Sequence, residues 1–144
     1  MQVTLKRQND AYLLAAENDL GLSIPLDASP EIGGGNAGFR PMQLLLAALG
    51  GCASFDLIHI LKKQRQDLRD IEIRVDGDRT PDAIPAPFTR MHLHFILTGR
   101  IDEKKAAQAI ELSVRKYCSV GAMLEKSGPI SYSYEIVAVE EDSA

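Results

Sequence analysis

Alternation of apolar and polar residues predicts strands at both ends of the chain and in its middle. Residues 70–78 show the pattern most clearly, because isoleucine and valine alternate there with charged side chains. Polar turn signals separate the other segments. The predicted strands span residues 2–8, 11–16, 20–26, 70–78, 88–99 and 130–140. The first three follow one another closely and predict an antiparallel meander.

Two segments follow a helical pattern instead. Residues 41–66 begin with Pro41, which suits the first turn of a helix because its missing N–H is not needed there. Apolar positions cover most of the circumference of this segment up to residue 61, which is typical of a buried helix. Residues 102–118 are amphipathic, and Asp102 is a suitable N-cap for them.

A short helical turn is expected over residues 119–128, so the elements follow the order βββ–α–ββ–α–β. This order predicts the α+β class, with a mostly antiparallel sheet covered by helices, in a single domain over residues 1–144. A small monomer covers only one face of a helix as apolar as residues 41–66. We therefore expect a homodimer, the commonest closed oligomer. Residues 141–144 are expected to fray.

Glycines stand at two places that need an explanation. Residues 28–38 form a loop with Gly33, Gly34 and Gly35 in a row, but the GxGxxG and GK[ST] patterns of phosphate-binding loops are absent. A flexible or closely packed loop is the favoured interpretation. Gly50 and Gly51 lie inside the long predicted helix and cost about 1 kcal/mol each relative to alanine. Close packing, or access to the next residue, has to offset that cost.

Composition and charge exclude several partners. The net charge is −4, whereas nucleic acids and anionic membranes bind clustered positive charge, so we expect neither as a partner. The start of the sequence has no apolar signal segment, and the longest apolar run, residues 44–53, is short of the roughly 20 residues that cross a bilayer. We therefore expect a cytoplasmic protein. No cofactor motif is present, so we expect no cofactor.

The two cysteines are the strongest candidates for chemistry. Cys52 and Cys118 lie 66 positions apart and form neither a CxxC motif nor a zinc-binding pattern. On the predicted helix, Asp56 and His59 share the face of Cys52, at about 40° on one side and about 20° on the other. Cys118 falls at a helical break, where the amides of a new helix favour a thiolate. From these residues alone, buried structural thiols and reactive thiols both stay possible.

Histidines and tyrosines on the later strands carry weaker signals. His92 and His94 alternate on one face of a strand and resemble half of a metal site, but no third ligand is indicated. Metal binding is therefore not expected. Tyr132 and Tyr134 also share one face of a strand and are most simply core or interface residues.

Two stretches of the sequence match the motifs of a known family. "GGGNAGFRPMQLLLAALGGCASFDLIHIL" is followed at a distance by "YCSVGAMLEKSG" and a closing strand. This order resembles the OsmC/Ohr family of small thiol-dependent peroxidases and their less characterised relatives. The resemblance implies an OsmC-like fold and an intertwined homodimer, in which the long central helices are buried together and the active sites lie at the subunit interface.

The resemblance also implies roles for individual residues. Cys52 matches the peroxidatic cysteine, which attacks a hydroperoxide and becomes a sulfenic acid. Cys118 matches the resolving cysteine, which forms a disulfide that an external dithiol reduces. An apolar pocket lined by Leu45, Leu49 and Phe55 would favour organic hydroperoxides over hydrogen peroxide. The implied function is hydroperoxide reduction in defence against oxidative stress.

The sequence departs from the family pattern beside Pro41. Characterised peroxidases of the family carry a glutamate just after this proline, and it helps to hold an arginine near the thiolate. Here Met42 and Gln43 follow the proline, and neither provides a carboxylate. Arg7 and Arg40 are the candidate cations. Two alternatives therefore stay open: a non-catalytic binding or sensing module for a small apolar or electrophilic ligand, and a structural role for both cysteines.

Overall fold

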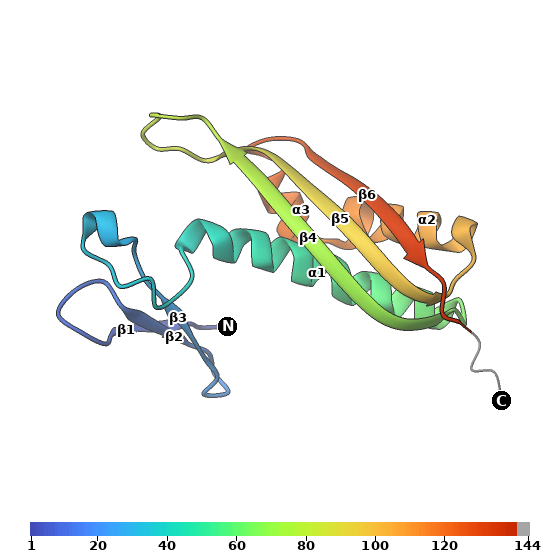
Figure 1. The fold of residues 1–144 in the computed structure, drawn as a ribbon, viewed down its shortest axis with the longest axis horizontal. Coiled ribbons are helices and arrows are strands. Elements are labelled where there is room, and N and C mark those ends of the chain that lie inside the picture. Colours follow the sequence, from blue (N-terminus) through green and yellow to red (C-terminus); the bar gives the residue numbers. More distant parts are fainter. Residues whose placement is uncertain (141–144) are drawn as a thin grey trace. The chain divides into compact units, whose positions relative to one another are not determined.

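The computed structural model of the chain describes residues 1–140, so the predicted fraying of residues 141–144 lies outside the described part. The order of elements matches the predicted βββ–α–ββ–α–β and confirms the α+β class (Figure 1). The elements are β1 (Thr4–Arg7), β2 (Leu14–Glu17), β3 (Ser23–Leu26), η1 (Pro30–Ile32), α1 (Pro41–Lys63), β4 (Asp67–Arg79), β5 (Phe88–Arg100), α2 (Glu103–Leu112), η2 (Ser113–Tyr117), α3 (Ser119–Leu124) and β6 (Ile130–Val137).

The chain forms two compact units, Met1–Leu45 and the part from Leu46 onward. The first contains β1, β2 and β3, and the second contains β4, β5 and β6 with the later helices. Helix α1 begins in the first unit and continues in the second. The assignment of residues 1–144 to a single domain stays a prediction.

The first unit is the predicted antiparallel meander. Its sheet has the order β1-β2-β3, and β2 pairs with both neighbours in antiparallel fashion. The glycine-rich loop that follows is closely packed, as one of the two interpretations expected. A Cβ atom on Gly34 would lie 1.9 Å from the carbonyl oxygen of Ala28, so only glycine fits there. No phosphate-binding role is needed to explain the loop.

The second unit has a sheet in the order β4-β5-β6. Strands β4 and β5 are antiparallel, whereas β5 and β6 are parallel, because the helices α2, η2 and α3 cross over between them. Among the described strands, this is the one parallel pair beside three antiparallel pairs, so the prediction of mostly antiparallel pairing is confirmed. The strands form two sheets of three rather than one sheet.

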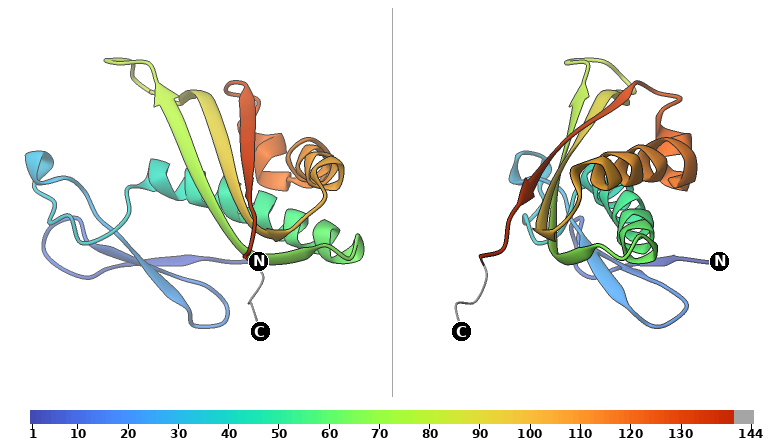
Figure 2. Two further views of the ribbon diagram at one scale, coloured as in Figure 1. Left: turned by 45° about the vertical axis from the view of Figure 1, so that its right-hand side comes forward. Right: turned by 90° about the vertical axis from the view of Figure 1, so that its right-hand side faces the viewer.

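One face of this sheet carries the core. Helices α1 and α2 both lie on that face (Figure 2). The long alternating strands β4 and β5 supply an apolar side toward the helices and a polar side away from them. The fully buried large side chains come from α1, β5 and α2: Leu49, Leu57, Leu61, Met91, Leu93, Phe95, Leu97 and Ile110.

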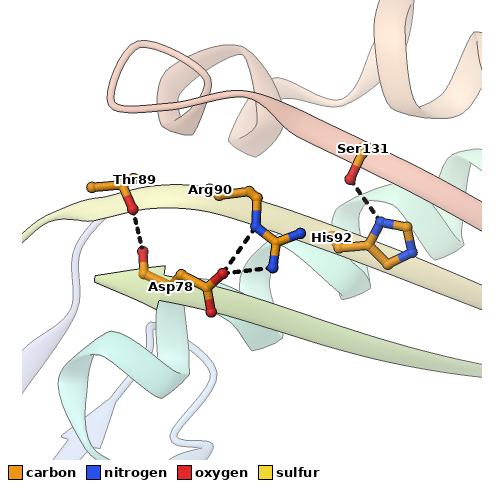
Figure 3. Close-up of polar contacts among 5 residues, drawn as sticks. All are labelled: Asp78, Thr89, Arg90, His92 and Ser131. Atoms are coloured by element: carbon orange, nitrogen blue, oxygen red, sulfur yellow. Dashed lines mark hydrogen bonds and ion pairs between the residues drawn. The ribbon is translucent and has the colours of Figure 1, made fainter. Parts of the chain in front are cut away.

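The opposite face of the sheet is polar (Figure 3). Arg90 donates a hydrogen bond of 2.6 Å to the Asp78 carboxylate in an ion pair, and His92 Nδ1 lies 2.7 Å from the Ser131 hydroxyl. His94 shares this face, as its alternation with His92 predicts, and contacts the Ser133 hydroxyl at 2.6 Å. Serine hydroxyls on β6 are therefore the partners of both histidines.

Helix α1 is buried on one side within this chain. Leu49, Gly50, Ala53, Leu57 and Leu61 face the sheet, while other apolar residues of the helix are exposed. The sequence predicts a buried helix, but within this chain only one side of α1 is buried.

By length and hydropathy alone α1 is also able to cross a membrane, a test that core helices of soluble proteins pass as well.

The close approach of β4 explains Gly50. A Cβ atom at this position would lie 2.9 Å from Cγ2 of Val75, whereas a Cβ atom at Gly51 would meet nothing within 4 Å. Two explanations for these glycines follow from the sequence: close packing, and access to the next residue. Close packing explains Gly50. At Gly51, which precedes Cys52, the space is open.

We expect Gly50→Ala to destabilise the protein although alanine favours the helix. Overpacking against Val75 costs about 1–3 kcal/mol, more than the roughly 1 kcal/mol gained in helix propensity. Urea denaturation of Gly50→Ala, Val75→Ala and the double variant measures the two effects separately. The double variant should recover part of the loss, with a coupling of about 1 kcal/mol. A Gly50→Ala protein as stable as the wild type would contradict this packing.

Candidate functional site

Cys52 lies in the middle of α1, one turn after Leu49. Its side chain is partly exposed, while Leu49 and Ala53 on either side are buried. A Cβ atom at the neighbouring Gly51 would meet nothing within 4 Å, so the space beside this position is open. A partly exposed thiol on a rigid helix is accessible to a small reactant.

Cys118 lies at the break that the sequence predicts. It connects η2 to α3 in an extended conformation, and its Sγ accepts a hydrogen bond of 3.2 Å from the backbone N–H of Gly121. The side chain is only 4% exposed. The sulfur is therefore the N-cap of α3 and sits among buried groups.

Gly121 allows this arrangement through its lack of a side chain. A Cβ atom there would lie 3.3 Å from Cys118 Sγ and 3.6 Å from Cδ1 of Leu49. The first distance is tight, so a larger residue would push against the sulfur that the Gly121 N–H contacts. Gly121 of α3 is also close to Leu49, which lies in the turn of α1 just before Cys52.

The structure brings the two thiols together. The Cys52 side chain lies within hydrogen-bonding reach of the Cys118 thiol, although the residues are 66 positions apart. Burial raises the pKa of Cys118 to about 11. The Gly121 N–H lowers this pKa, while the hydrogen bond with Cys52 and the nearby Asp56 carboxylate raise it further. Cys118 is accordingly a thiol at neutral pH.

Asp56 and His59, which share one face of α1, both line a cavity of about 380 Å³. The cavity is closed by residues of α1, by the residue that follows α1 and by residues of α2 and η2: Ile60, Lys63, Gln64, Leu112 and Tyr117. The sequence identified Asp56 and His59 through their shared face with Cys52. It missed the others, although Lys63 continues the helical spacing, because η2 approaches only in the tertiary structure.

The three residues expected to line an apolar pocket differ in burial. Leu49 is 1% exposed, Leu45 is 39% exposed and Phe55 is 76% exposed. None of them lines the cavity beside Asp56. Within the chain, Leu49 is a core residue that contacts the cysteine site, and Phe55 projects from α1 into solvent.

The two candidate cations both belong to the first unit. Arg7 donates from Nε to the carbonyl of Ala11 at 2.9 Å, and its guanidinium also contacts the carbonyl of Asp10, so it closes the β1–β2 turn. Arg40 donates to the carbonyl of Asp27 at 3.3 Å and also contacts Asn36. Both guanidinium groups therefore have local hydrogen-bond partners.

The buried carboxylate of Asp27 organises the loop that precedes Arg40. This residue was not identified from the sequence. Asp27 accepts hydrogen bonds from the backbone N–H groups of Ala28 at 2.8 Å and of Gly35 and Ala37 at 3.0 Å. The bond from Ala37 above all holds the pKa of Asp27 below its usual value, although burial opposes the shift. Gln43, in the region where the family has a glutamate, caps the start of α1 by accepting from the Arg40 N–H at 2.9 Å.

Metal-ligating side chains do not gather in the described part of the chain. Over residues 1–140 no group of three or more His, Cys, Asp or Glu side chains could hold a metal ion. The histidines on β5 are bonded to serine hydroxyls instead. The candidate site therefore consists of the thiol pair and the cavity beside it.

Comparison with known proteins places this arrangement in a family. A family model described as OsmC-like protein matches residues 33–133. The chain is 46% identical over 108 residues to Protein YhfA of Escherichia coli (strain K12). The aligned region covers 72% of this chain and 80% of that protein.

Two solved structures are similar across nearly the whole chain. The OsmC-like protein of Mycoplasma pneumoniae has a TM-score of 0.80 at 19% identity, covering 94% of this chain and 96% of that one. The organic hydroperoxide resistance protein OhrB of Bacillus subtilis has a TM-score of 0.62 at 18% identity, covering 94% and 98%. These likenesses establish the OsmC-like fold, a fold consistent with a soluble protein. Since the family model spans more than half of the chain, the chain belongs to the OsmC-like protein family, which confirms the family that the sequence resembles.

Proposed function

We propose that the protein is a thiol-dependent peroxidase that reduces organic hydroperoxides in defence against oxidative stress. The observation that carries the proposal is the thiol pair, in which a partly exposed Cys52 lies within hydrogen-bonding reach of a buried Cys118. Family membership supports a role in peroxide resistance or stress response, because the family fold includes proteins named for organic hydroperoxide resistance.

The first step is nucleophilic attack by Cys52. Its thiolate attacks one oxygen of the hydroperoxide, an S–O bond forms and the O–O bond breaks. The second oxygen leaves as the alcohol after taking up a proton. Cys52 is then a sulfenic acid. The exposure of this thiol and the open space at Gly51 give the peroxide access.

The second step joins the two cysteines. The Cys118 sulfur attacks the sulfenic acid of Cys52, so that an S–S bond forms and water leaves. In total, one hydroperoxide and two thiols become one alcohol, one water and one disulfide. Contact between the thiols before the reaction shortens the path to this disulfide. An external dithiol then restores both thiols.

Further residues take proposed roles in the reaction. Arg7 and Arg40 are the proposed cations that favour the Cys52 thiolate. Leu45, Leu49 and Phe55 are the proposed apolar contacts of the organic substrate. We locate the reaction in the cytoplasm, where thiols are kept reduced.

We also propose a homodimer. Apolar residues that α1 exposes in the single chain support it, because a helix side of this kind is unfavourable in water. The exposed apolar residues of α1 are Leu45, Ala47, Ala48, Phe55 and Ile58. A second copy of the chain would cover them and give the fully buried helix that the sequence predicts.

Cysteine variants test the roles of the two thiols. Cys52→Ser should abolish reduction of cumene hydroperoxide. Cys118→Ser should allow one turnover and leave a sulfenic acid that dimedone traps on Cys52, detected by mass spectrometry. In the wild type a Cys52–Cys118 disulfide should form on adding less than one equivalent of peroxide. Survival of both thiols in excess peroxide would refute the peroxidase, and ligand binding that persists in Cys52→Ser would favour the binding module instead.

The pH dependence of disulfide formation tests the role of Cys118. Since its pKa is about 11, the fraction of thiolate, and with it the rate of the second step, should rise about tenfold per pH unit between about pH 7.5 and 9.5. Asp56→Asn removes a negative charge that raises this pKa, so the profile should move to lower pH. Quench-flow mass spectrometry of the sulfenic acid measures the rate. A flat profile, or a shift to higher pH in Asp56→Asn, would argue against the assignment.

Sedimentation of surface variants tests the dimer. Phe55→Asp places a charge on the exposed side of α1 and should convert the dimer into a monomer in analytical ultracentrifugation. Ile84→Asp is the matched control, because Ile84 is an exposed apolar residue of the β4–β5 loop. It should leave the dimer intact. A wild-type protein that sediments as a monomer at micromolar concentration would overturn this proposal.

A further inference from the structure

We infer that the cavity between α1, α2 and η2 is a binding site for a short peptide with free termini, of dipeptide to tripeptide length. The lining contains neither Cys52 nor Cys118, so the ligand contacts the walls of the cavity and not the thiols. The site goes beyond the proposed peroxidase and does not depend on it. Its support comes from ionisable side chains without partners, from a buried amide oxygen and from the apolar remainder of the lining.

Three ionisable side chains of α1 line the cavity without a partner of their own. They are Asp56, His59 and Lys63, and within residues 1–140 none of these side chains takes part in a hydrogen bond or an ion pair. Their spacing of i, i+3 and i+7 places them on one stripe of the helix. A carboxylate and an ammonium group at the two ends of this stripe match a ligand with the opposite charges at its own ends.

The spacing of the two charges sets the length of the ligand. Asp56 and Lys63 are seven residues apart, which is about 10.5 Å along the axis of α1. An extended peptide spans about 3.5 Å per residue, so two or three residues bridge this distance. The terminal ammonium group of the peptide would lie at Asp56 and its carboxylate at Lys63. The cavity volume of about 380 Å³ is within the range of small-molecule sites.

The rest of the lining suits a peptide group and an apolar side chain. Gln64 lines the cavity, and its Oε1 is buried without a hydrogen-bond partner among the described residues, while its amide nitrogen donates to Gln108 at 3.4 Å. Since buried polar atoms normally have a partner, a peptide N–H is a suitable donor once this amide turns toward the cavity. Ile60 and Leu112 add apolar contacts.

The cavity is distinct from the surface of the proposed dimer. The residues that line it do not include any of the exposed apolar residues of α1 that a second copy would cover. The proposed dimer and the peptide site therefore use different residues of the same helix.

Asp56 links the cavity to the thiol pair through its charge. Its carboxylate is among the groups that raise the pKa of Cys118. The ammonium group of a bound peptide would offset this negative charge and so lower that pKa. This consequence, unlike the binding site itself, rests on the proposed peroxidase: the bound peptide should move the pH profile of disulfide formation in the same direction as Asp56→Asn.

Titration calorimetry of the reduced protein with leucyl-alanine tests the site. We expect a Kd of about 1 mM or lower, as is typical of a ligand of this size. Lys63→Glu should weaken the binding about tenfold. The control Lys62→Glu makes the same change in net charge outside the cavity lining, so its Kd should stay within about twofold of the wild type.

Blocked peptides assign the two ends of the ligand. N-acetyl-leucyl-alanine lacks the ammonium group, and leucyl-alanine amide lacks the carboxylate. Acetylation should weaken binding to the wild type about tenfold, but binding to Asp56→Asn by less than about twofold, because the partner charge is already absent there. Amidation should give the same contrast between the wild type and Lys63→Met.

The results decide for or against the site whatever the enzyme does. Equal losses in Lys63→Glu and Lys62→Glu overturn it, as do equal effects of acetylation on the wild type and Asp56→Asn, or no binding at about 10 mM peptide. Peptide binding that leaves the pH profile of disulfide formation unchanged overturns only the link through Asp56. If peroxide forms no disulfide, the peroxidase is refuted, and the calorimetry still decides on the peptide site.

Discussion

The contact between α1 and the start of α3 is the interaction on which the candidate site depends. Gly121 of α3 approaches both groups there, because a Cβ atom added to it would lie 3.3 Å from the Cys118 sulfur and 3.6 Å from Cδ1 of Leu49. Because Leu49 is anchored in the core over the sheet, the turn of α1 that carries Cys52 is held against the N-cap sulfur of α3. A small residue at position 121 is the condition for this approach, since a side chain there would press on the sulfur.

Opposing electrostatic effects give the two thiols different characters. Burial and the Asp56 carboxylate disfavour a Cys118 thiolate, while the Gly121 N–H favours it, and burial is the largest of these effects. The buried Cys118 is therefore protonated at neutral pH. In the proposed reaction, the partly exposed Cys52 is the thiol that meets the substrate. The same Asp56 also lines the adjacent cavity.

The first unit has a different organising group. Asp27 gathers three backbone N–H groups of the glycine-rich loop and is itself buried, and Arg40 donates to its carbonyl. The loop that the family motif marks is thus shaped by hydrogen bonds to one carboxylate. Gln43, which has no charge, caps the start of α1 by accepting a hydrogen bond from the Arg40 N–H. Of the two proposed cations, Arg40 belongs to this loop network, whereas Arg7 closes the β1–β2 turn.

Local sequence determined the elements and their order, because alternation, helical spacing, Pro41 and the Asp102 cap act over a few residues. The break at Cys118 was readable for the same reason. Tertiary structure alone decided the parallel pairing of β5 with β6, the fit of Gly50 against Val75 and the assembly of the cavity from α1, α2 and η2. It also decided that Cys52 and Cys118 meet. Each of these depends on side chains far apart in the sequence, and no local pattern records which distant residue a side chain will contact.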